Sequence, residues 1–335
     1  MSPIPKDPLR LSPLPEIDVG TAGHHVIMHS ASDLARVLLA TGRRRYGRLG
    51  LRLGDALSRR WLERTRNPYL PDIAAMAGGL GEDGIFLLNL SHEWACTAGV
   101  APDPGGTGSR LLRVLDWSQE GLGACLVVAR HASPAGPFLS ATWPGFAGVA
   151  TAMAPGRFSA AFNQTPVPAR GLGPVGDWVH QRVTMWRSSG LPPAHLLRRV
   201  FETCTTYDAA LEELRDGPLC VPVLFTLSGI EPGEGCVIER TADRAFVHPA
   251  PVAAANHWLT RGCDGRPRGQ NSHVRAEVME WLCVEMAGES LSWLRPPILN
   301  PTTRVVAEAN AALNRLVVQG WEKSGPVTVL WRGGV

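Results

Sequence analysis

Residues 92–117, HEWACTAGVAPDPGGTGSRLLRVLDW, place one cysteine ahead of two segments that have the composition of paired strands. Cys96 opens the first segment, and Arg113 and Asp116 stand near the end of the second, beyond a loop rich in proline and glycine. This order predicts a hairpin that brings a cation and a carboxylate to a thiol. Such surroundings lower the pKa of a thiol and prepare the thiolate to attack a carbonyl carbon. A buried structural cysteine beside an unrelated ion pair fits the same residues, because Arg-x-x-Asp is a common pattern.

The rest of the chain alternates between helical and strand-like regions. Residues 1–28 are expected to form an extended arm, and apolar residues at helical spacing predict helices across 31–80. Short strands are expected across 84–162, beginning with an apolar strand at 85–91. Beyond them we expect helices across 177–216, strands across 220–250, a helix at 272–287, and strands near 303–310, 314–319 and 326–332. This order predicts two mixed sheets covered by helices.

Several pieces of sequence, in a fixed order, resemble the N-terminal-nucleophile amide hydrolases. They are Cys96-Thr97, Arg113-x-x-Asp116, WPGFAGVATAMAPGRFSAAFNQTP with Asn163, GCVIERTADRAFV, Asn256-His257-Trp258 and PPILNPTTRVV. The resemblance is greatest to the acid ceramidase and N-acylethanolamine acid amidase group, with choloylglycine hydrolases and penicillin acyltransferases as more distant relatives. It implies an α+β fold, a four-layer αββα sandwich with an N-terminal helical segment. It also implies two chains, a candidate α-chain or propeptide at 1–95 and a catalytic domain, the candidate β-chain, at 96–335.

The resemblance implies a role for each residue around the cysteine. In that family the precursor cuts its own backbone before the nucleophile, here between Ala95 and Cys96, and the freed α-amine becomes the base. An α-amine suits that task, since its unperturbed pKa is about 7.7–8.0. Arg113 would orient the amine or thiolate, and Asp116 would hold the α-ammonium or fix Arg113. Asn256 would donate its amide N–H to the oxyanion of a tetrahedral intermediate.

Other positions are expected to bind the substrate. Asn163 stands where the relatives keep a substrate-facing Asn, although an Asn before Gln-Thr-Pro also suits a turn. Arg266 is the best match for the arginine that follows the family's Asn motif, with Arg268 and Arg275 as alternatives. His257 is expected to be a structural histidine. Where the relatives carry a hydroxyl residue before the cleaved bond and a Thr before the Asn, this chain has alanine, at positions 95 and 255.

Aromatic residues crowd the region in which the relatives line their acyl pocket. Trp143 and Phe146 are the first of them, and the full set is Trp143, Phe146, Phe158, Phe162, Trp178 and Trp186. Because aromatic side chains supply large apolar area, they predict a preference for an apolar acyl group. The alternative is that they belong to the ordinary core.

Composition excludes several other classes of protein. A net charge of +3 is too small to indicate a nucleic-acid partner. The longest apolar runs are too short to span a bilayer, and the proline-rich N-terminus does not resemble a secretory signal. The seven cysteines show neither a CxxC pair nor metal-ligand spacing, which argues against a zinc site and favours a reducing cytoplasm. No cofactor is expected.

One segment, residues 43–66, concentrates basic charge, with nine arginines against Asp55 and Glu63. A solvated helix face is favoured over contact with an anionic membrane surface.

These observations predict a hydrolase that cleaves a linear, non-peptide carbon–nitrogen amide bond through a thioester on Cys96. Its partner would be a small N-acyl amide with an apolar acyl group, and the two cleaved chains would associate with each other. An acyltransferase, which passes the acyl group to an amine or a β-lactam nucleus, is the alternative among enzymes. A non-catalytic binding protein that keeps the fold is the alternative outside them.

Overall fold

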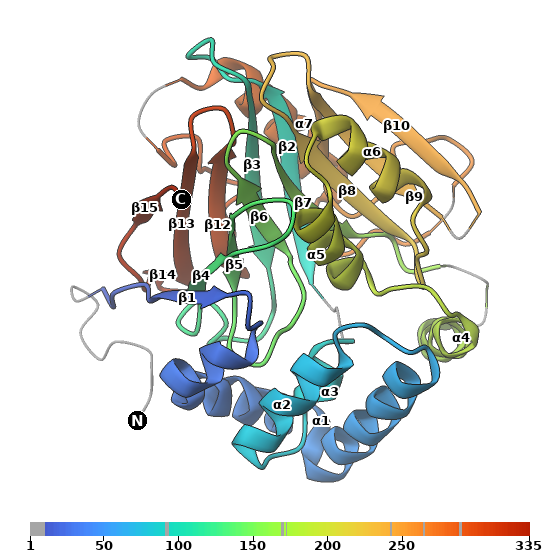
Figure 1. Ribbon diagram of the computed structural model, residues 1–335. Helices are drawn as coiled ribbons and strands as arrows, with labels where there is room; N and C mark the ends of the chain where they lie inside the picture. The colour runs from blue at the N-terminus through green and yellow to red at the C-terminus, as the bar shows by residue number, and fades with distance from the viewer. Residues whose placement is uncertain are drawn as a thin grey trace.

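Two β-sheets stacked face to face form the centre of the molecule (Figure 1). The computed structural model describes residues 11–90, 94–168, 171, 173–241, 243–263, 265–287 and 290–335. The larger sheet has eight strands, in the spatial order β1 (Glu16–Gly20), β4 (Val127–His131), β5 (Phe138–Thr142), β6 (Thr151–Ala154), β7 (Phe158–Gln164), β8 (Val223–Ser228), β9 (Gly235–Arg240) and β10 (Ala245–Pro249). The smaller sheet has the order β11 (Val252–Ala254), β2 (Ala95–Pro102), β3 (Ser109–Asp116), β12 (Thr303–Asn310), β13 (Arg315–Glu322) and β14 (Gly325–Pro326), and β15 (Trp331–Gly333) also pairs with β13.

Helices cover the outer face of each sheet. On the larger sheet, α5 (Pro193–Thr203) packs against β7, and α6 (Tyr207–Asp216) packs against β8 and β9. On the smaller sheet, α7 (Ser272–Glu285) packs against β2, β3 and β11. The four-layer αββα sandwich expected from the sequence is therefore confirmed.

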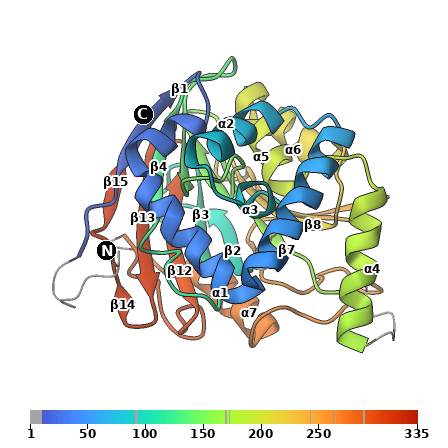
Figure 2. The ribbon, with the colours of Figure 1, turned by 90° about the horizontal axis from the view of Figure 1, so that it is seen from below.

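The N-terminal helices gather at one end of the sandwich (Figures 1 and 2). They are α1 (His25–Arg64), α2 (Leu70–Leu80) and α3 (Ile85–Leu88), and α4 (Gly173–Arg187) lies beside them. Figure 2 shows α1 as two diverging arms, and its backbone leaves the helical conformation at Gly47, where φ is 70°. Glycine tolerates that left-handed conformation without a steric penalty. Within the described ranges, none of the helices combines the length and apolar character that a bilayer crossing requires.

Two local expectations were wrong. The apolar run at 85–91 begins as helix α3 rather than as a strand, and residues 91–93 lie outside the described residues. A short run that is apolar on every side fits a buried helix as well as a buried strand, because periodicity cannot separate them. The expected extended arm contains β1, which pairs in parallel with β4, and α1 already begins at His25. Residues 1–10 of that arm are also outside the described part.

The alternation of side chains along β3 decides what faces the centre. Leu111 and Leu115 enter the core between the sheets, whereas Leu112 and Val114 pack with residues of α7 on the outer side. In the antiparallel pair of β2 and β3, Cys96 lies directly opposite Leu115. Opposed residues of such a pair share a face, so the thiol also points into the space between the sheets.

A buried polar cluster fastens the N-terminal helices to the rest of the molecule. The carboxylate of Asp72 on α2 accepts the backbone N–H groups of His24 and His25 at 2.9 and 2.8 Å. It also accepts Nη1 of Arg198, on α5, at 2.9 Å. Arg198 in turn donates to the Ala147 carbonyl at 2.7 Å. Charge-assisted hydrogen bonds therefore join residues on both sides of position 95.

Candidate active site

The thiol of Cys96 lies beside one arginine. Cys96 is fully buried at the start of β2, and Nη2 of Arg113 lies 3.2 Å from its Sγ. Arg113 is two residues from Leu115 on β3, so it points to the same face of the sheet as the thiol. The hairpin thus delivers a guanidinium group to the cysteine in the space between the sheets.

Arg113 also reaches across to the larger sheet. Its Nη1 donates to Oδ1 of Asn163, on β7, while Nδ2 of Asn163 donates to the carbonyl groups of Ala254 and Ala255 at 2.8 and 3.1 Å. Asn163 is therefore a buried strand residue rather than a turn residue. In the described part of the chain, the buried Nε of Arg113 has no hydrogen-bond partner. A donor left in this state beside the thiol is suited to a substrate oxygen.

Asp116 faces the other side of the sheet. It lies opposite Ala95, and its Oδ2 is 3.5 Å from Nη1 of Arg275 on α7. Its Oδ1 accepts the hydroxyl of Thr303 at 3.0 Å. The expectation that Arg113 and Asp116 flank the thiol together is corrected here, because side chains three apart on a regular strand point to opposite faces. Asp116 stands next to the Ala95–Cys96 peptide rather than next to the sulfur.

Among the three candidate arginines, Arg275 is the one that contacts the nucleophile. It is buried, and its Nη1 donates to the Cys96 carbonyl at 2.9 Å and to the Thr97 hydroxyl at 2.6 Å. Its Nη2 donates to Oδ1 of Asn256 at 3.2 Å. One guanidinium group therefore links the nucleophile's carbonyl to Asn256 and to Asp116.

Arg266, the first choice from the sequence, lies elsewhere. Its backbone pairs with Val167 and its side chain is exposed. Arg268 donates from Nε to the Thr165 carbonyl at 2.8 Å, and its own carbonyl accepts from Arg275. The loop before α7 folds back on itself, so distance along the chain did not indicate which arginine reaches the cysteine.

Asn256 holds the nitrogen of Cys96. Its Oδ1 accepts the Cys96 backbone N–H at 2.8 Å, and its Nδ2 donates to the Gln164 carbonyl at 2.8 Å. These partners fix the orientation of the amide, since one can only donate and the other can only accept. The amide N–H expected to serve an oxyanion is thus bonded to Gln164 in the uncut chain. His257 bonds Ser272 through Nδ1 at 2.9 Å, as suits a structural histidine.

Burial dominates the electrostatics of the thiol. It raises the pKa of Cys96, and Asp116 acts in the same direction, whereas the nearby charges of Arg113 and Arg275 lower it. Burial likewise raises the pKa of Asp116, against the lowering effect of Arg275. In the uncut chain the sulfur is therefore held as the neutral thiol. A thiolate needs a base close by.

Trp143 and Phe146 surround a small apolar cavity. They are 2% and 1% exposed, and their rings lie 5.6 and 5.8 Å from the ring of Trp94. With Leu38, Leu39, Leu88, Leu122 and others they line a cavity of about 50 Å³. Of the other aromatic candidates, Phe162 also contacts Trp94, whereas Phe158 packs on α5 and Trp186 is partly exposed. The side chain of Trp178 lies outside the described residues.

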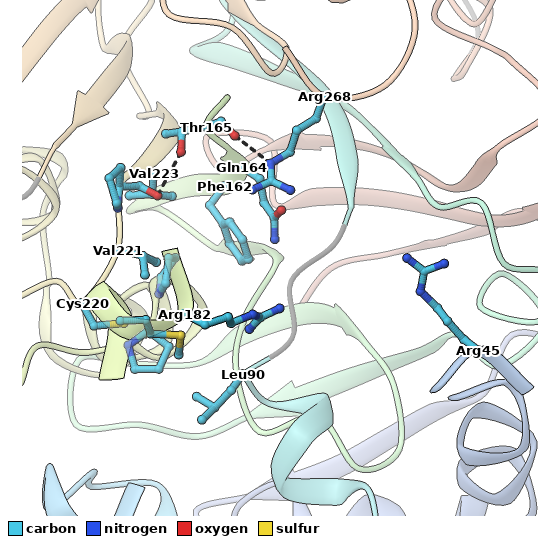
Figure 3. Close-up of a pocket in the computed structure, with 14 residues that line it drawn as sticks. Arg45, Leu90, Phe162, Gln164, Thr165, Arg182, Cys220, Val221, Val223 and Arg268 are labelled. Carbon is cyan, nitrogen blue, oxygen red and sulfur yellow. Dashed lines mark hydrogen bonds between the residues drawn. The ribbon is translucent and has the colours of Figure 1, made fainter. Parts of the chain in front are cut away.

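A larger pocket is lined in part by Phe162 and Gln164 of β7, and the sequence did not indicate it (Figure 3). Its volume is about 390 Å³. Its lining includes Gln164, whose carbonyl accepts from Asn256, and Phe162, which precedes Asn163 on β7. The remaining lining residues are Arg45, Leu90, Thr165, Arg182, Met185, Pro192, Pro193, Cys220, Val221, Pro222, Val223 and Arg268.

An apolar groove of about 290 Å³ between α1 and α4 continues from that pocket, and the two share Leu90, Arg182 and Met185. Helix α1 also exposes leucines at helical spacing, Leu49, Leu53 and Leu57, of which Leu57 lines the groove. The face expected to be a solvated basic surface is thus partly apolar. In the ranges that the structure describes, no group of three or more His, Cys, Asp and Glu side chains is arranged to hold a metal ion.

The chain is similar, over part of its length, to two named amide hydrolases. Acid ceramidase of Balaenoptera acutorostrata scammoni is 30% identical over 103 residues, which are 31% of this chain and 25% of that protein. N-acylethanolamine-hydrolyzing acid amidase of Oryctolagus cuniculus is 27% identical over 183 residues, 52% of this chain and 48% of that protein. The similarity thus spans about a quarter to a half of these relatives. The expected resemblance to this group is confirmed, although no family model matches the chain.

Among solved structures, the chain is similar to the Caenorhabditis elegans N-acylethanolamine-hydrolyzing acid amidase ortholog. That structure is 21% identical, and the alignment covers 65% of this chain and 93% of the other, with a TM-score of 0.47.

Proposed function

We propose that the chain is an amide hydrolase that uses Cys96 as an N-terminal nucleophile after cutting its own backbone between Ala95 and Cys96. One observation carries the proposal: three side chains converge on the single residue Cys96. Arg113 contacts its sulfur, Asn256 its nitrogen and Arg275 its carbonyl oxygen. A cysteine with a purely structural role would not require side-chain hydrogen bonds to its backbone nitrogen and carbonyl oxygen. The similarity to ceramidase and acid amidase supports the same reaction class.

Maturation would begin with attack of the Cys96 sulfur on the carbonyl carbon of Ala95. The bond from that carbon to the Cys96 nitrogen breaks, the nitrogen takes a proton, and a thioester remains. Water then releases the Ala95 carboxylate and restores the thiol. The new α-amine would stay within reach of Asn256 Oδ1, which already accepts from this nitrogen. Asp116, across the strand pair from Ala95, would hold the amine when it is protonated.

Turnover would use the same groups. The α-amine takes the thiol proton, the thiolate attacks the amide carbonyl of the substrate, and the α-ammonium returns a proton to the leaving amine. Arg113 would orient the substrate carbonyl, since its Nε is a buried donor with no described partner. Asn163 would position Arg113, to which it is bonded. Asn256 would donate to the oxyanion only if its Nδ2 leaves the Gln164 carbonyl.

The acyl group would be apolar and would enter beside Trp143 and Phe146. These rings line the apolar cavity next to Trp94, two residues before the nucleophile. Residues 1–95 and 96–335 would remain associated after cleavage, because the contacts of Asp72 with Arg198 cross between them. Cytoplasmic function is part of this proposal. All seven cysteines, each within the described ranges, are free thiols, as a reducing compartment allows.

Transfer of the acyl group to an amine is the second candidate reaction, because the thioester on Cys96 can react with either acceptor. A non-catalytic binding role would require that Cys96 stay uncut and unreactive.

The test is product formation from N-dodecanoylethanolamine and from N-dodecanoylglycine by the purified wild-type protein and by Cys96→Ala. Release of dodecanoic acid by the wild type alone supports hydrolysis. A new amide formed with an added amine indicates transfer. The binding role would be supported if both proteins release dodecanoic acid only at the background rate and if a thiol-alkylating reagent fails to modify Cys96.

A further inference from the structure

The pocket of about 390 Å³ is called the cationic pocket, because all the charged side chains among its described lining residues are positive. Three arginines line it, Arg45 from α1, Arg182 from α4 and Arg268 from the loop before α7. Among the described lining residues there is no Asp or Glu. In Figure 3 the side chains of Arg268 and Arg182 extend toward the cavity from different sides, and Arg45 stands farther out. A concave wall with one sign of charge raises the local concentration of ions of the opposite sign.

These three guanidinium groups also interact with other groups of the protein. The property that favours an anion in the pocket is therefore their combined positive charge. Arg268, for example, donates from Nε to the Thr165 carbonyl. An arginine presents five N–H donors in a planar fork whose geometry matches the two oxygens of a carboxylate.

A second, independent feature of the pocket is an unsatisfied amide. Gln164 is 9% exposed, and its Oε1 has no hydrogen-bond partner within the described part of the chain. Its backbone carbonyl accepts from Asn256, which in turn accepts the Cys96 nitrogen. The backbone of Gln164 is therefore linked through Asn256 to the nucleophile, and its side chain lines the pocket. A buried acceptor without a partner is suited to an N–H group of a ligand.

Trp94 lines the apolar cavity and lies next to a residue of this pocket. Its ring lies 6.2 Å from Phe162, which lines the cationic pocket, and 5.8 Å from Phe146, which lines the apolar cavity. The two sides of the site thus differ in chemistry. An acyl chain suits the cavity lined by aromatic rings, and a charged group suits the pocket lined by arginines.

We propose that the cationic pocket binds the amine half of the substrate and that this half carries a carboxylate, so the substrate is an N-acyl amino acid. The carboxylate would bind Arg182 and Arg268, with Arg45 at the rim, and the amide N–H would donate to Oε1 of Gln164. This inference rests on the proposed amide hydrolysis and adds the chemistry of the leaving group. It implies that a neutral leaving group, such as ethanolamine, is a poor fit.

Binding is the cleanest test, because it does not require turnover. The Cys96→Ala chain would be titrated by calorimetry with N-octanoylglycine and with N-octanoylglycinamide, which has the same shape without the charge. We expect the glycine compound to bind at least about tenfold more tightly, as one or two charged hydrogen bonds allow. Arg182→Gln in the same background should remove most of that difference. Arg187→Gln is the matched control, since Arg187 is an exposed arginine of the same helix outside the pocket lining.

Turnover by the wild-type protein then separates the two proposals. Equal affinity for the two ligands, or no binding of either, overturns the carboxylate pocket whatever the enzyme does. Hydrolysis of both amides at equal kcat/KM would also overturn it while leaving amide hydrolysis intact. Selective binding by Cys96→Ala without hydrolysis by the wild type would keep the pocket and reject the catalytic proposal. Arg182→Gln should act chiefly on KM for the glycine amide, with kcat little changed.

Discussion

Arg113 and Asp116, three residues apart on β3, lie on opposite faces of the same sheet. Arg113 contacts the sulfur of Cys96, in the space between the sheets, whereas Asp116 meets Arg275 on the outer side. Residues on both faces of the smaller sheet therefore contact the nucleophile Cys96. Its sulfur contacts Arg113, and its carbonyl oxygen accepts from Arg275, which also pairs with Asp116. This division suggests separate tasks, with Arg113 acting on the sulfur and substrate and Asp116 acting on the freed amine.

Replacing either member of the pair should reduce turnover by two orders of magnitude or more. Arg113→Ala removes the charge beside the sulfur, and Asp116→Asn removes the charge that would hold the α-ammonium, losses typical of a missing base or oxyanion contact. The measurement is kcat/KM for an N-acyl amide, with self-cleavage scored separately by gel. Arg110→Ala is the matched control, since Arg110 is a buried arginine of the same strand that, among the described residues, bonds to carbonyl groups of Cys283 and Met286. Near-normal turnover in both folded variants would mean that the pair is structural.

Strand alternation explains which part of this site could be predicted from the sequence. The hairpin and the proximity of Arg113 to Cys96 follow from local pattern. The separation of Asp116 also follows from a period of two, once β3 is known to stay regular up to its last residue. The sequence alone left open a bend at Trp117, which would have brought both side chains to one face.

Contacts between segments that are far apart in the chain could not be predicted, because no periodic pattern in the sequence reports them. Arg275 reaches Cys96 because Gly269, at φ +68°, lets the loop pass close to Ala95: a Cβ at this glycine would lie 2.8 Å from that of Ala95. The cationic pocket joins α1, α4 and the loop before α7, which are far apart in the chain. The layers of the fold were predictable because periodicity is local. Helix α3 was not, because its apolar run has no period that separates helix from strand.

Arg275→Ala should impair both self-cleavage and turnover, whereas Arg266→Ala should leave both near the wild-type level. Arg275 is buried and contacts Cys96, Asp116 and Asn256, so its loss leaves the buried Asp116 carboxylate without its cation and the Cys96 carbonyl without this donor. Arg266 is exposed, and within the described part of the chain its backbone forms a bridge with Val167. The fraction of cleaved protein and kcat/KM would both be measured. The reverse ranking of the two variants would show that the loop rearranges and that Arg266 is the site arginine.

Stability should fall as the solution becomes acidic. Burial, followed by the charge of Arg198, lowers the pKa of His24 to about 4, so the folded state binds this proton less readily than the unfolded chain does. The stabilisation is complete above pH 6.5 and is lost as the pH falls toward 4. A shift from 6.5 to about 4 corresponds to roughly 3 kcal/mol at most.

Urea unfolding at pH 7.5, 5.5 and 4.5 measures this effect. His24→Asn keeps a donor near the Phe146 carbonyl, which His24 Nδ1 contacts at 2.6 Å, but it cannot be protonated. The variant should show a flatter pH dependence of the unfolding free energy than the wild type. His29→Asn, at an exposed position on α1, the helix that begins directly after His24, should behave as the wild type does. An unchanged slope in His24→Asn would assign the acid sensitivity to other groups.

The acyl preference should depend on chain length. If the acyl chain enters beside Trp143 and Phe146, each additional buried CH₂ contributes about 0.8 kcal/mol. kcat/KM should therefore rise steadily across N-acyl amides from acetyl toward dodecanoyl, and Phe146→Ala should shift the preferred length. A specificity constant that stays flat across the series would show that these rings are only core.

The most direct measurement of the central claim is the intact mass of the freshly purified protein, with labelling of its α-amines. Self-cleavage before Cys96 predicts two chains, of 95 and 240 residues (335 − 95), that copurify, with the new α-amine on Cys96. Cys96→Ala should give a single chain of 36.0 kDa. A wild-type protein that stays at 36.0 kDa, hydrolyses amides and keeps its activity after its α-amines are blocked would contradict an N-terminal nucleophile at Cys96.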